Sequence, residues 1–326
     1  MTSTRPLLAL LCSLPLLPAC SLSQEELDRI ADYRQRAAQY YAVNDLDRAE
    51  HQARLGLEMD PENGTLQHLL GRTLLKKGGD KEVQLARQHL EIAHEELGDF
   101  QTAYSLGEYH LRHAELLIGS VIILRGKMSK IDPDDSDRLA QKKADIEDRE
   151  RRSLEHLNQS LELLDEALGE RQEWVEALQH RASALAHLKR NNEALQTIDE
   201  LCDVLERSRE NKNSRLATQE FDLAQEHSYR QAILKDIAWE VEARGLAASI
   251  LMNDKLWPEA EAQLTQILKL SPNRANEFYN RGLARYFQGS LQGAANDMRS
   301  FLGKTTLNKE TAQVERALAI LDEFGG

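Results

Sequence analysis

The sequence predicts an all-α protein built from a repeated pair of helices. In its C-terminal part, small residues recur at one spacing: Ala248 and Ala260 are twelve residues apart, and so are Gly282 and Ala294. From Ala260 to Ala294 the step is thirty-four residues. Helices that cross closely need small residues at the crossing. A repeat of this length therefore indicates helix pairs that stack because one pair cannot bury its own apolar face.

Composition supports the same fold class and excludes some functions. The chain is 41% hydrophobic, has only 5% aromatic residues and contains seven prolines, which fits a helical array rich in Ala and Leu. It carries 41 basic and 54 acidic side chains, a net charge of −13. We therefore expect neither general nucleic-acid binding nor binding to anionic lipid.

One segment resembles a known repeat family. Residues 275–284 read Ala-Asn-Glu-Phe-Tyr-Asn-Arg-Gly-Leu-Ala, with Gly289 at the next turn and Pro272 ending the helix before them. This segment, with the thirty-four-residue period, resembles the first helix of a tetratricopeptide repeat. The resemblance implies a right-handed superhelical solenoid of helix-turn-helix repeats, here with two helical insertions.

The N-terminus reads as a secretion signal. Arg5 precedes an apolar run over residues 7–17, too short to span a bilayer, and Leu-Pro-Ala-Cys follows with Cys20 last. The ending resembles the lipobox of bacterial lipoproteins, which implies a signal peptide over 1–19, an acylated Cys20, and an anchor and linker over 20–29. An alternative is an ordinary signal cleaved after Ala19, with Cys20 incidental. Ser21 in place of Asp favours the outer membrane.

The N-terminal half holds three predicted repeats. Residues 30–98 form repeats 1 and 2, in which Ala37 and Gly71 are the small residues of the first helices. Repeat 3 covers 99–168. Gly107 is the small residue of its first helix, and Ser153 is the best match for the small residue of its second helix. That spacing requires a helical insertion at about 113–152, which we expect to project from the solenoid.

The C-terminal half is more regular. Repeat 4 covers 169–208, and a second helical insertion covers 209–240. Repeats 5 and 6 cover 241–304. Residues 305–326 have apolar residues at helical spacing and predict a final helix that caps the open end of the stack.

Few residues suggest chemistry. His110 and His113 lie one helical turn apart and would need further ligands to hold a metal. The acidic residues from Asp132 to Asp137 lack the glycine and closing glutamate of a calcium loop, so they read as a helix cap. Cys202 lies in an apolar helical stretch and predicts packing. No nucleophile or nucleotide motif occurs, so we expect no enzyme activity, metal or cofactor.

Function is therefore expected on the surface. The family pattern places nine residues on the inner face of the superhelix, where tetratricopeptide arrays hold peptides. They are Arg34, Tyr41, His68, Arg72, Lys76, Tyr104 and Arg112 in the first three repeats, and Tyr279 and Tyr286 in the sixth. Four cations there predict an N-terminal half that binds an acidic segment or a free C-terminus, and an aromatic C-terminal half that binds an apolar one. Alternatively, they are solvated residues paired with acids of the second helices.

Three hypotheses follow. The first is a lipid-anchored scaffold without activity that binds protein or peptide partners in the bacterial cell envelope, facing the periplasm. The second is a regulatory or assembly subunit acting through the projecting insertion, similar to type IV pilus pilotins, outer-membrane assembly subunits or adaptors of peptidoglycan enzymes. The third is a soluble cytosolic adaptor.

Overall fold

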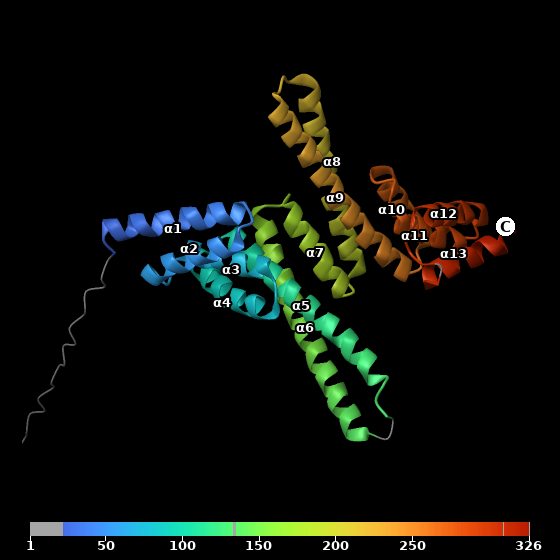
Figure 1. Ribbon diagram of the computed structural model, residues 1–326, viewed down its shortest axis with the longest axis horizontal. Coiled ribbons are helices and arrows are strands. Elements are labelled where there is room, and N and C mark those ends of the chain that lie inside the picture. The colour runs from blue at the N-terminus through green and yellow to red at the C-terminus, as the bar shows by residue number, and fades with distance from the viewer. Residues whose placement is uncertain (1–21, 133–134, 309, 326) are drawn as a thin grey trace, which may run out of the picture.

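The computed structural model describes residues 22–132, 135–308 and 310–325, and this part of the chain is helical without strands (Figure 1). It contains thirteen helices. They are α1 (Gln24–Ala42), α2 (Leu46–Met59), α3 (Gly64–Lys77), α4 (Asp80–Leu97), α5 (Phe100–Met128), α6 (Ser136–Glu170), α7 (Val175–His187), α8 (Asn191–Thr218), α9 (Leu223–Asn253), α10 (Trp257–Leu270), α11 (Ala275–Phe287), α12 (Leu291–Lys304) and α13 (Ala312–Glu323). The all-α prediction is confirmed. No helix in the described ranges is long and apolar enough to cross a membrane.

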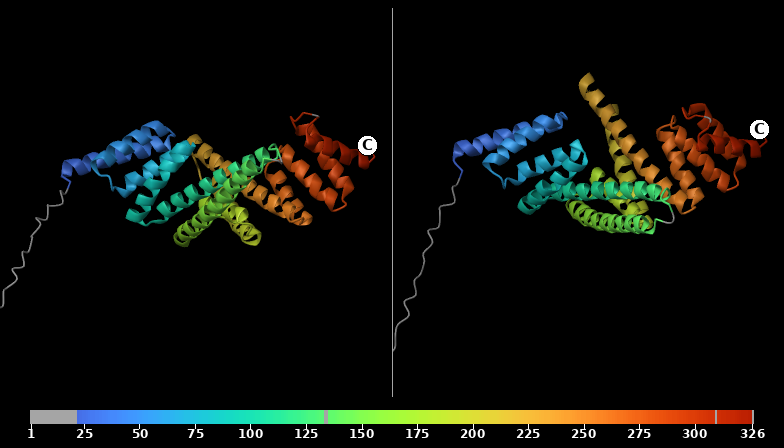
Figure 2. Two further views of the ribbon diagram at one scale, coloured as in Figure 1. Left: turned by 90° about the horizontal axis from the view of Figure 1, so that it is seen from below. Right: turned by 60° about the horizontal axis from the view of Figure 1, so that its bottom comes forward.

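Successive helices pack as antiparallel pairs that stack in chain order (Figure 2). The pairs are α1 with α2, α3 with α4, α5 with α6, α7 with α8, α9 with α10, and α11 with α12. Each second helix also contacts the first helix of the next pair. After the last pair, α13 buries Val314, Ala317 and Ile320 against the stack, so the open end is covered by one amphipathic helix.

The turn between the two helices has the same backbone geometry at the same position in four of the pairs. Asn44, Lys189, Lys255 and Gly289 all have left-handed backbones, with φ of 62°, 61°, 61° and 78°. Each lies seven residues after the small residue of its first helix, and the following N–H bonds back across the turn, as Ser290 N does to Arg285 O at 2.9 Å. Lys255 and Gly289 are thirty-four residues apart, so the shared turn agrees with the spacing of the last two repeats.

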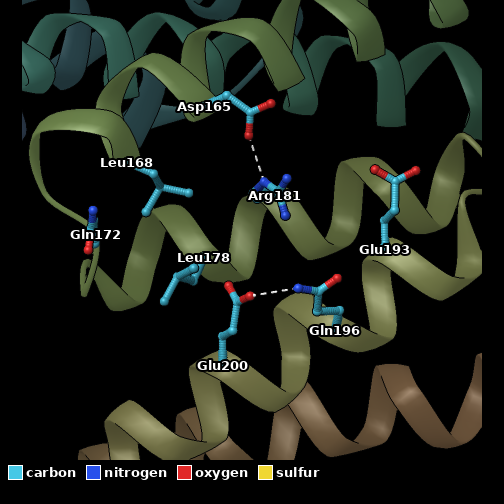
Figure 3. Close-up of a pocket in the computed structure, with 8 residues that line it drawn as sticks. All are labelled: Asp165, Leu168, Gln172, Leu178, Arg181, Glu193, Gln196 and Glu200. Carbon is cyan, nitrogen blue, oxygen red and sulfur yellow. Dashed lines mark hydrogen bonds and ion pairs between the residues drawn. The ribbon is translucent and has the colours of Figure 1, made fainter.

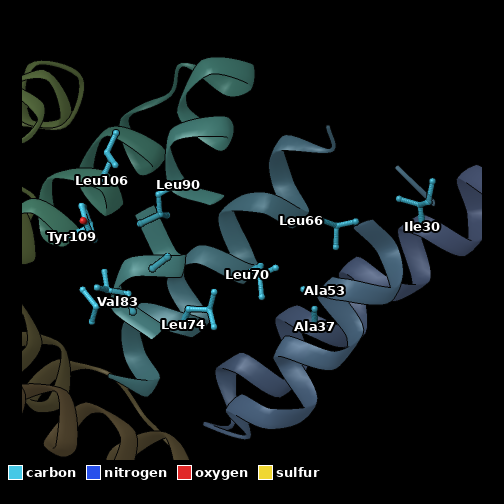
Figure 4. Close-up of a cluster of buried hydrophobic side chains, with 12 residues drawn as sticks. Ile30, Ala37, Ala53, Leu66, Leu70, Leu74, Val83, Leu90, Leu106 and Tyr109 are labelled. Atoms are coloured by element: carbon cyan, nitrogen blue, oxygen red, sulfur yellow. The ribbon is translucent and has the colours of Figure 1, made fainter. Parts of the chain in front are cut away.

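At two of the crossings between paired helices the small residue is a glycine with no room for a side chain. A Cβ at Gly71 of α3 would lie 2.6 Å from Leu90 Cγ, and one at Gly282 of α11 would lie 2.8 Å from Met298 Cε. Leu90 belongs to the apolar core that joins the first three pairs, in which Leu66 and Leu70 are also fully buried (Figure 4). Further apolar clusters follow between the later helices up to α13, as expected for pairs that cannot bury their apolar faces alone.

The third pair differs from the predicted alignment. Gly107 of α5 packs against Leu163 and Leu164 of α6, and Ser160 Oγ donates to Gly107 O at 2.8 Å. The crossing therefore lies two turns beyond Ser153, the residue matched from the sequence. The repeat period does not determine where two helices cross when both are lengthened. The crossing predicted at Ser153 was therefore displaced along α6 from the observed one.

Two long hairpins project from the stack in different directions (Figure 1). In the α5–α6 hairpin, both lengthened helices belong to the third pair. In the other hairpin, α8 is the second helix of the fourth pair and α9 is the first helix of the fifth pair. Residues 209–218 continue α8, and α9 begins after a short turn at Leu223. Buried ion pairs hold the base of this second hairpin, including Arg209 with Glu240 and Lys212 with Asp236.

Candidate functional site

The candidate site is the side of the stack formed by the first helices of the pairs, which we call the first-helix face. Its N-terminal end contains one aromatic ring with two cations. The Arg72 guanidinium lies 4.9 Å from the centroid of the Tyr41 ring, and Lys76 Nζ lies 4.7 Å from it. Arg72 and Lys76 are four residues apart on α3 and so share one side of the helix. We call these three residues the Tyr41 cluster.

The cations of the Tyr41 cluster differ from most cations of this chain in having no acidic partner among the described residues. Within the described ranges, neither Arg72 nor Lys76 forms an ion pair, and both contact the Tyr41 ring. By contrast, Arg281 of the first helix α11 is neutralised, because it binds both oxygens of Asp297 at 2.8 and 2.9 Å. A guanidinium and an ammonium side by side offer several donors in suitable positions for a carboxylate.

Arg112 of α5 is more restricted. Its Nη1 donates to Leu75 O of α3 at 3.1 Å, and its Nη2 lies 2.6 Å from Glu108 Oε1. Its guanidinium therefore joins the second and third pairs and is already partly neutralised. Arg34 of α1 is exposed on the same face.

His68, predicted as a groove residue, is buried between pairs. Only 8% of it is exposed, and its Nε2 lies 2.8 Å from Ser105 Oγ. Ser105 Oγ itself donates to Gln101 O, so the imidazole must be the donor to Ser105. Burial, helped by the nearby Arg72 charge, lowers the pKa of His68 to about 4. His68 is thus a neutral group that joins α3 to α5 and is not open to a ligand.

Tyr104 forms an aromatic stack that was not predicted. Its ring centroid lies 4.3 Å from that of Trp174 and 5.5 Å from that of His180, with which it is nearly parallel. Burial raises the pKa of Tyr104 and lowers the pKa of His180. Trp174 and His180 were missed because their contact with Tyr104 depends on how α7 packs on α5.

The two tyrosines of the predicted aromatic half of the groove both contact the C-terminal helices. Tyr279 is 7% exposed, and its ring centroid lies 5.1 Å from that of Phe301 in the core under α13. Tyr286 donates its hydroxyl to Glu323 Oε2 of α13 at 2.7 Å. Tyr279 is therefore used for packing and is closed to a ligand. Tyr286 stays partly exposed although α13 binds its hydroxyl, so ligand binding there remains a prediction.

A surface hollow of about 440 Å³ lies between α6, α7 and α8 (Figure 3). Arg181 in it donates to Asp165 at 2.6 Å and to Thr197, and Gln196 donates to Glu200 at 3.2 Å. The polar side chains thus satisfy one another, and we assign the hollow no ligand.

Three histidines meet between α5 and α6. His110 Nδ1 and His156 Nδ1 are 2.8 Å apart, and the His113 and His156 ring centroids are 4.4 Å apart. Burial first, then the neighbouring ring, lowers the pKa of His110 to about 3 and of His156 to about 4. Their side chains are not arranged to hold a metal ion, and the described residues contain no other group of three or more His, Cys, Asp or Glu side chains that is.

The other predicted groups are placed as follows. Asp135 caps α6, since its side chain accepts from Arg138 N at 3.2 Å. Cys202 is a buried free thiol, and burial raises its pKa to about 12. Cys20 and the signal segment lie outside the described residues.

No protein-family model and no curated protein matches the chain. Solved structures do resemble it. The pilF protein of Pseudomonas aeruginosa has 11% identity and a TM-score of 0.53 over 91% of this chain and 99% of its own. The Cut9–Hcn1 hetero-tetramer of the APC/C has 12% identity and a TM-score of 0.50 over 93% of this chain, which spans only 43% of that one. A tetratricopeptide protein of Thermus thermophilus has 16% identity, a TM-score of 0.40, and coverage of 78% and 98%. The chain folds as a solenoid of tetratricopeptide repeats.

Proposed function

We propose that this protein is a non-catalytic scaffold that binds protein or peptide partners on its first-helix face, with a partner carboxylate at the Tyr41 cluster. The observation that carries the proposal is the position of Arg72 and Lys76 over one ring, where neither cation forms an ion pair with a described acidic residue. In a chain with a net charge of −13, few surfaces attract an acidic ligand. A free C-terminus or an acidic side chain suits this one.

The cluster is also partly ordered before binding. Tyr41 contacts both cations, and each such contact contributes about 0.5–1 kcal/mol at an exposed site. Ordering these long side chains in advance reduces the entropy lost when a ligand binds. The neighbouring Arg112, fixed on Leu75 O, extends the donor surface toward α5.

A selection experiment tests this proposal without a known partner. A peptide library with free C-termini would be selected on the immobilised protein and on the Arg72→Glu, Lys76→Glu variant. We expect acidic residues or a required free carboxylate among peptides selected by the natural protein, and loss of that preference with the variant. The same preference for both proteins, or no acidic preference, would contradict the proposal.

We further propose that a lipid on Cys20 holds the scaffold in the bacterial envelope, at the outer membrane and facing the periplasm. The apolar run over 7–17 and the Leu-Pro-Ala-Cys ending support this. Fractionation with and without globomycin, which blocks removal of lipoprotein signals, separates this proposal from a soluble cytosolic adaptor. A lipoprotein should accumulate as an uncleaved precursor, whereas an adaptor should stay soluble in both cases.

A second candidate function is a regulatory or assembly subunit that acts through the α5–α6 hairpin. The hairpin leaves Ile122 and Ile123 exposed, which favours a contact with another protein there. An enzyme or secretion component that copurifies with the full chain only when this surface is intact would favour the second function.

A further inference from the structure

The projecting part of α5 has apolar side chains on two sides. Ala114, Leu117 and Val121 are buried in the hairpin. On the opposite side, Leu116, Ile122 and Ile123 remain 48%, 66% and 60% exposed. A surface helix normally presents polar residues to water, and one that is apolar on all sides is normally covered. We call the exposed side, from Leu116 to Lys130, the outer α5 face.

The outer α5 face continues the first-helix face. Starting from Arg112, which contacts Leu75 of α3, steps of three or four residues reach Leu116, Gly119 and Ile123. These residues therefore share one side of α5. At the edge of the stack, Glu115 lies 3.6 Å from His187 of α7. Beyond that point the hairpin extends away from the body (Figure 1), so the face runs from the stack onto the projecting arm.

Two glycines shape this face. Gly119 and Gly126 lie seven residues apart, and a Cβ on either would meet nothing within 4 Å. Glycine inside a helix costs about 0.5–1 kcal/mol relative to alanine, and the packing of this chain does not require it at either position. The missing side chains leave hollows beside Leu116 and Ile123, into which large side chains of a second helix fit.

Charge indicates which kind of helix fits. Lys127, near the end of α5, and Lys130, in the turn that follows the helix, form no ion pair within the described ranges. Arg125, on another side of α5, pairs with Glu150 at 2.5 Å. A second copy of this chain would bring the same uncompensated cations. The face therefore complements a different helix that carries acidic residues.

We propose that the outer α5 face binds a helical segment of a partner protein, with large apolar side chains against Gly119 and Gly126 and acidic residues near Lys127 and Lys130. This inference rests on the proposed scaffold function, but it uses a surface separate from the Tyr41 cluster.

Site-specific cross-linking tests the inference in the full chain. A photoreactive residue would replace Ile123 in the producing cells, and the control would carry it at Leu154, an exposed leucine of α6. The cross-linked segment would be identified by mass spectrometry, synthesised and titrated against purified variants. Gly119→Leu fills the hollow without a clash in the free chain, and Gly303→Leu is its control, because a Cβ there also meets nothing. Lys127→Glu with Lys130→Glu tests charge, with Lys143→Glu as control.

We expect Ile123 to cross-link to one segment of another protein and Leu154 not to do so. The affinity of that segment should fall at least about tenfold in Gly119→Leu and in the double lysine variant, and by less than about twofold in the controls. A cross-link only to a second copy, only to lipid, or to nothing would overturn the inference, as would unchanged affinities. If Arg72→Glu with Lys76→Glu abolishes binding while Gly119→Leu and the double lysine variant do not, helix binding at the outer α5 face is refuted and the scaffold proposal stands.

Discussion

Replacing Gly71 by alanine should destabilise the protein. The new Cβ would lie 2.6 Å from Leu90 Cγ and 2.7 Å from Leu90 Cδ2, where carbon atoms normally stay about 3.5–4.0 Å apart. Leu90 is fully buried and the backbone oxygen of Ala86 lies 3.3 Å from the same Cβ, so neither neighbour moves freely. Overpacking costs about 1–3 kcal/mol, and the better helix propensity of alanine returns about 0.5–1 kcal/mol. The difference is about 0–2.5 kcal/mol, and we expect a net loss of about 1 kcal/mol in the free energy of unfolding.

The same substitution at Gly119 supplies the control. A Cβ there meets nothing within 4 Å, so Gly119→Ala should raise the free energy of unfolding by about 0.5–1 kcal/mol. Gly282→Ala should fall between the two, because its nearest atom is the flexible end of Met298. Urea denaturation followed by far-ultraviolet circular dichroism measures all three variants. If Gly71→Ala were as stable as Gly119→Ala, the close crossing of α3 and α4 would be refuted.

Three other predictions concern pH, anchoring and a turn. His68 and His110 are buried in the folded chain, with pKa values of about 4 and about 3. As the pH falls below 6.5, these two histidines therefore bind protons in the unfolded chain before they do so in the folded chain. Stability present above pH 6.5 should therefore fall toward pH 4, by about 1.4 kcal/mol per pH unit for each histidine, and a flat pH series of urea titrations would contradict this. Cys20→Ala should release the protein from membranes without unfolding it. If the variant still sedimented with the membranes after a high-salt wash, the lipid anchor would be disproved. Lys255→Gly should stabilise by up to about 1 kcal/mol, since φ there is 61°, and a lower unfolding midpoint would count against that backbone.

The repeat register could be predicted from the sequence because it depends on local requirements. Close crossings demand small residues such as Gly71 and Gly282, and the turn position held by Gly289 recurs thirty-four residues after Lys255. Each requirement is met within one helix pair. The period and the order of the helices follow directly from them.

The alignment inside the α5–α6 hairpin could not be predicted in the same way. When both helices of a pair lengthen together, a shift along one of them preserves the apolar pattern. Ser153 and Ser160 are both buried and both fit that pattern, yet only Ser160 bonds to Gly107 O. The choice depends on contacts between two helices and is not encoded in the period.

For the candidate site too, what depends on one helix could be predicted, and what depends on neighbouring pairs could not. Arg72 and Lys76 could be placed on the first-helix face because their position depends only on the register of α3. Whether a residue on that face is open depends on the neighbouring pair. Ser105 of the next pair occupies the polar edge of His68, and the capping helix α13 binds Tyr286 through Glu323. Sequence positions on a helix therefore predicted the side of the stack better than they predicted exposure.

The central claim is that the Tyr41 cluster binds a carboxylate, and one titration tests it most directly. The affinity of an acidic peptide from the library selection would be measured over a range of salt concentrations for three proteins: the natural chain, Arg72→Glu with Lys76→Glu, and Lys269→Glu with Arg299→Glu. The last pair has the same charge change on the second helices α10 and α12, where both cations are exposed. We predict at least about a tenfold loss for the first double variant, together with loss of the salt dependence, and no more than about a twofold change for the second. Equal affinity for the two double variants, or weaker binding of the first with an unchanged salt dependence, would contradict the account.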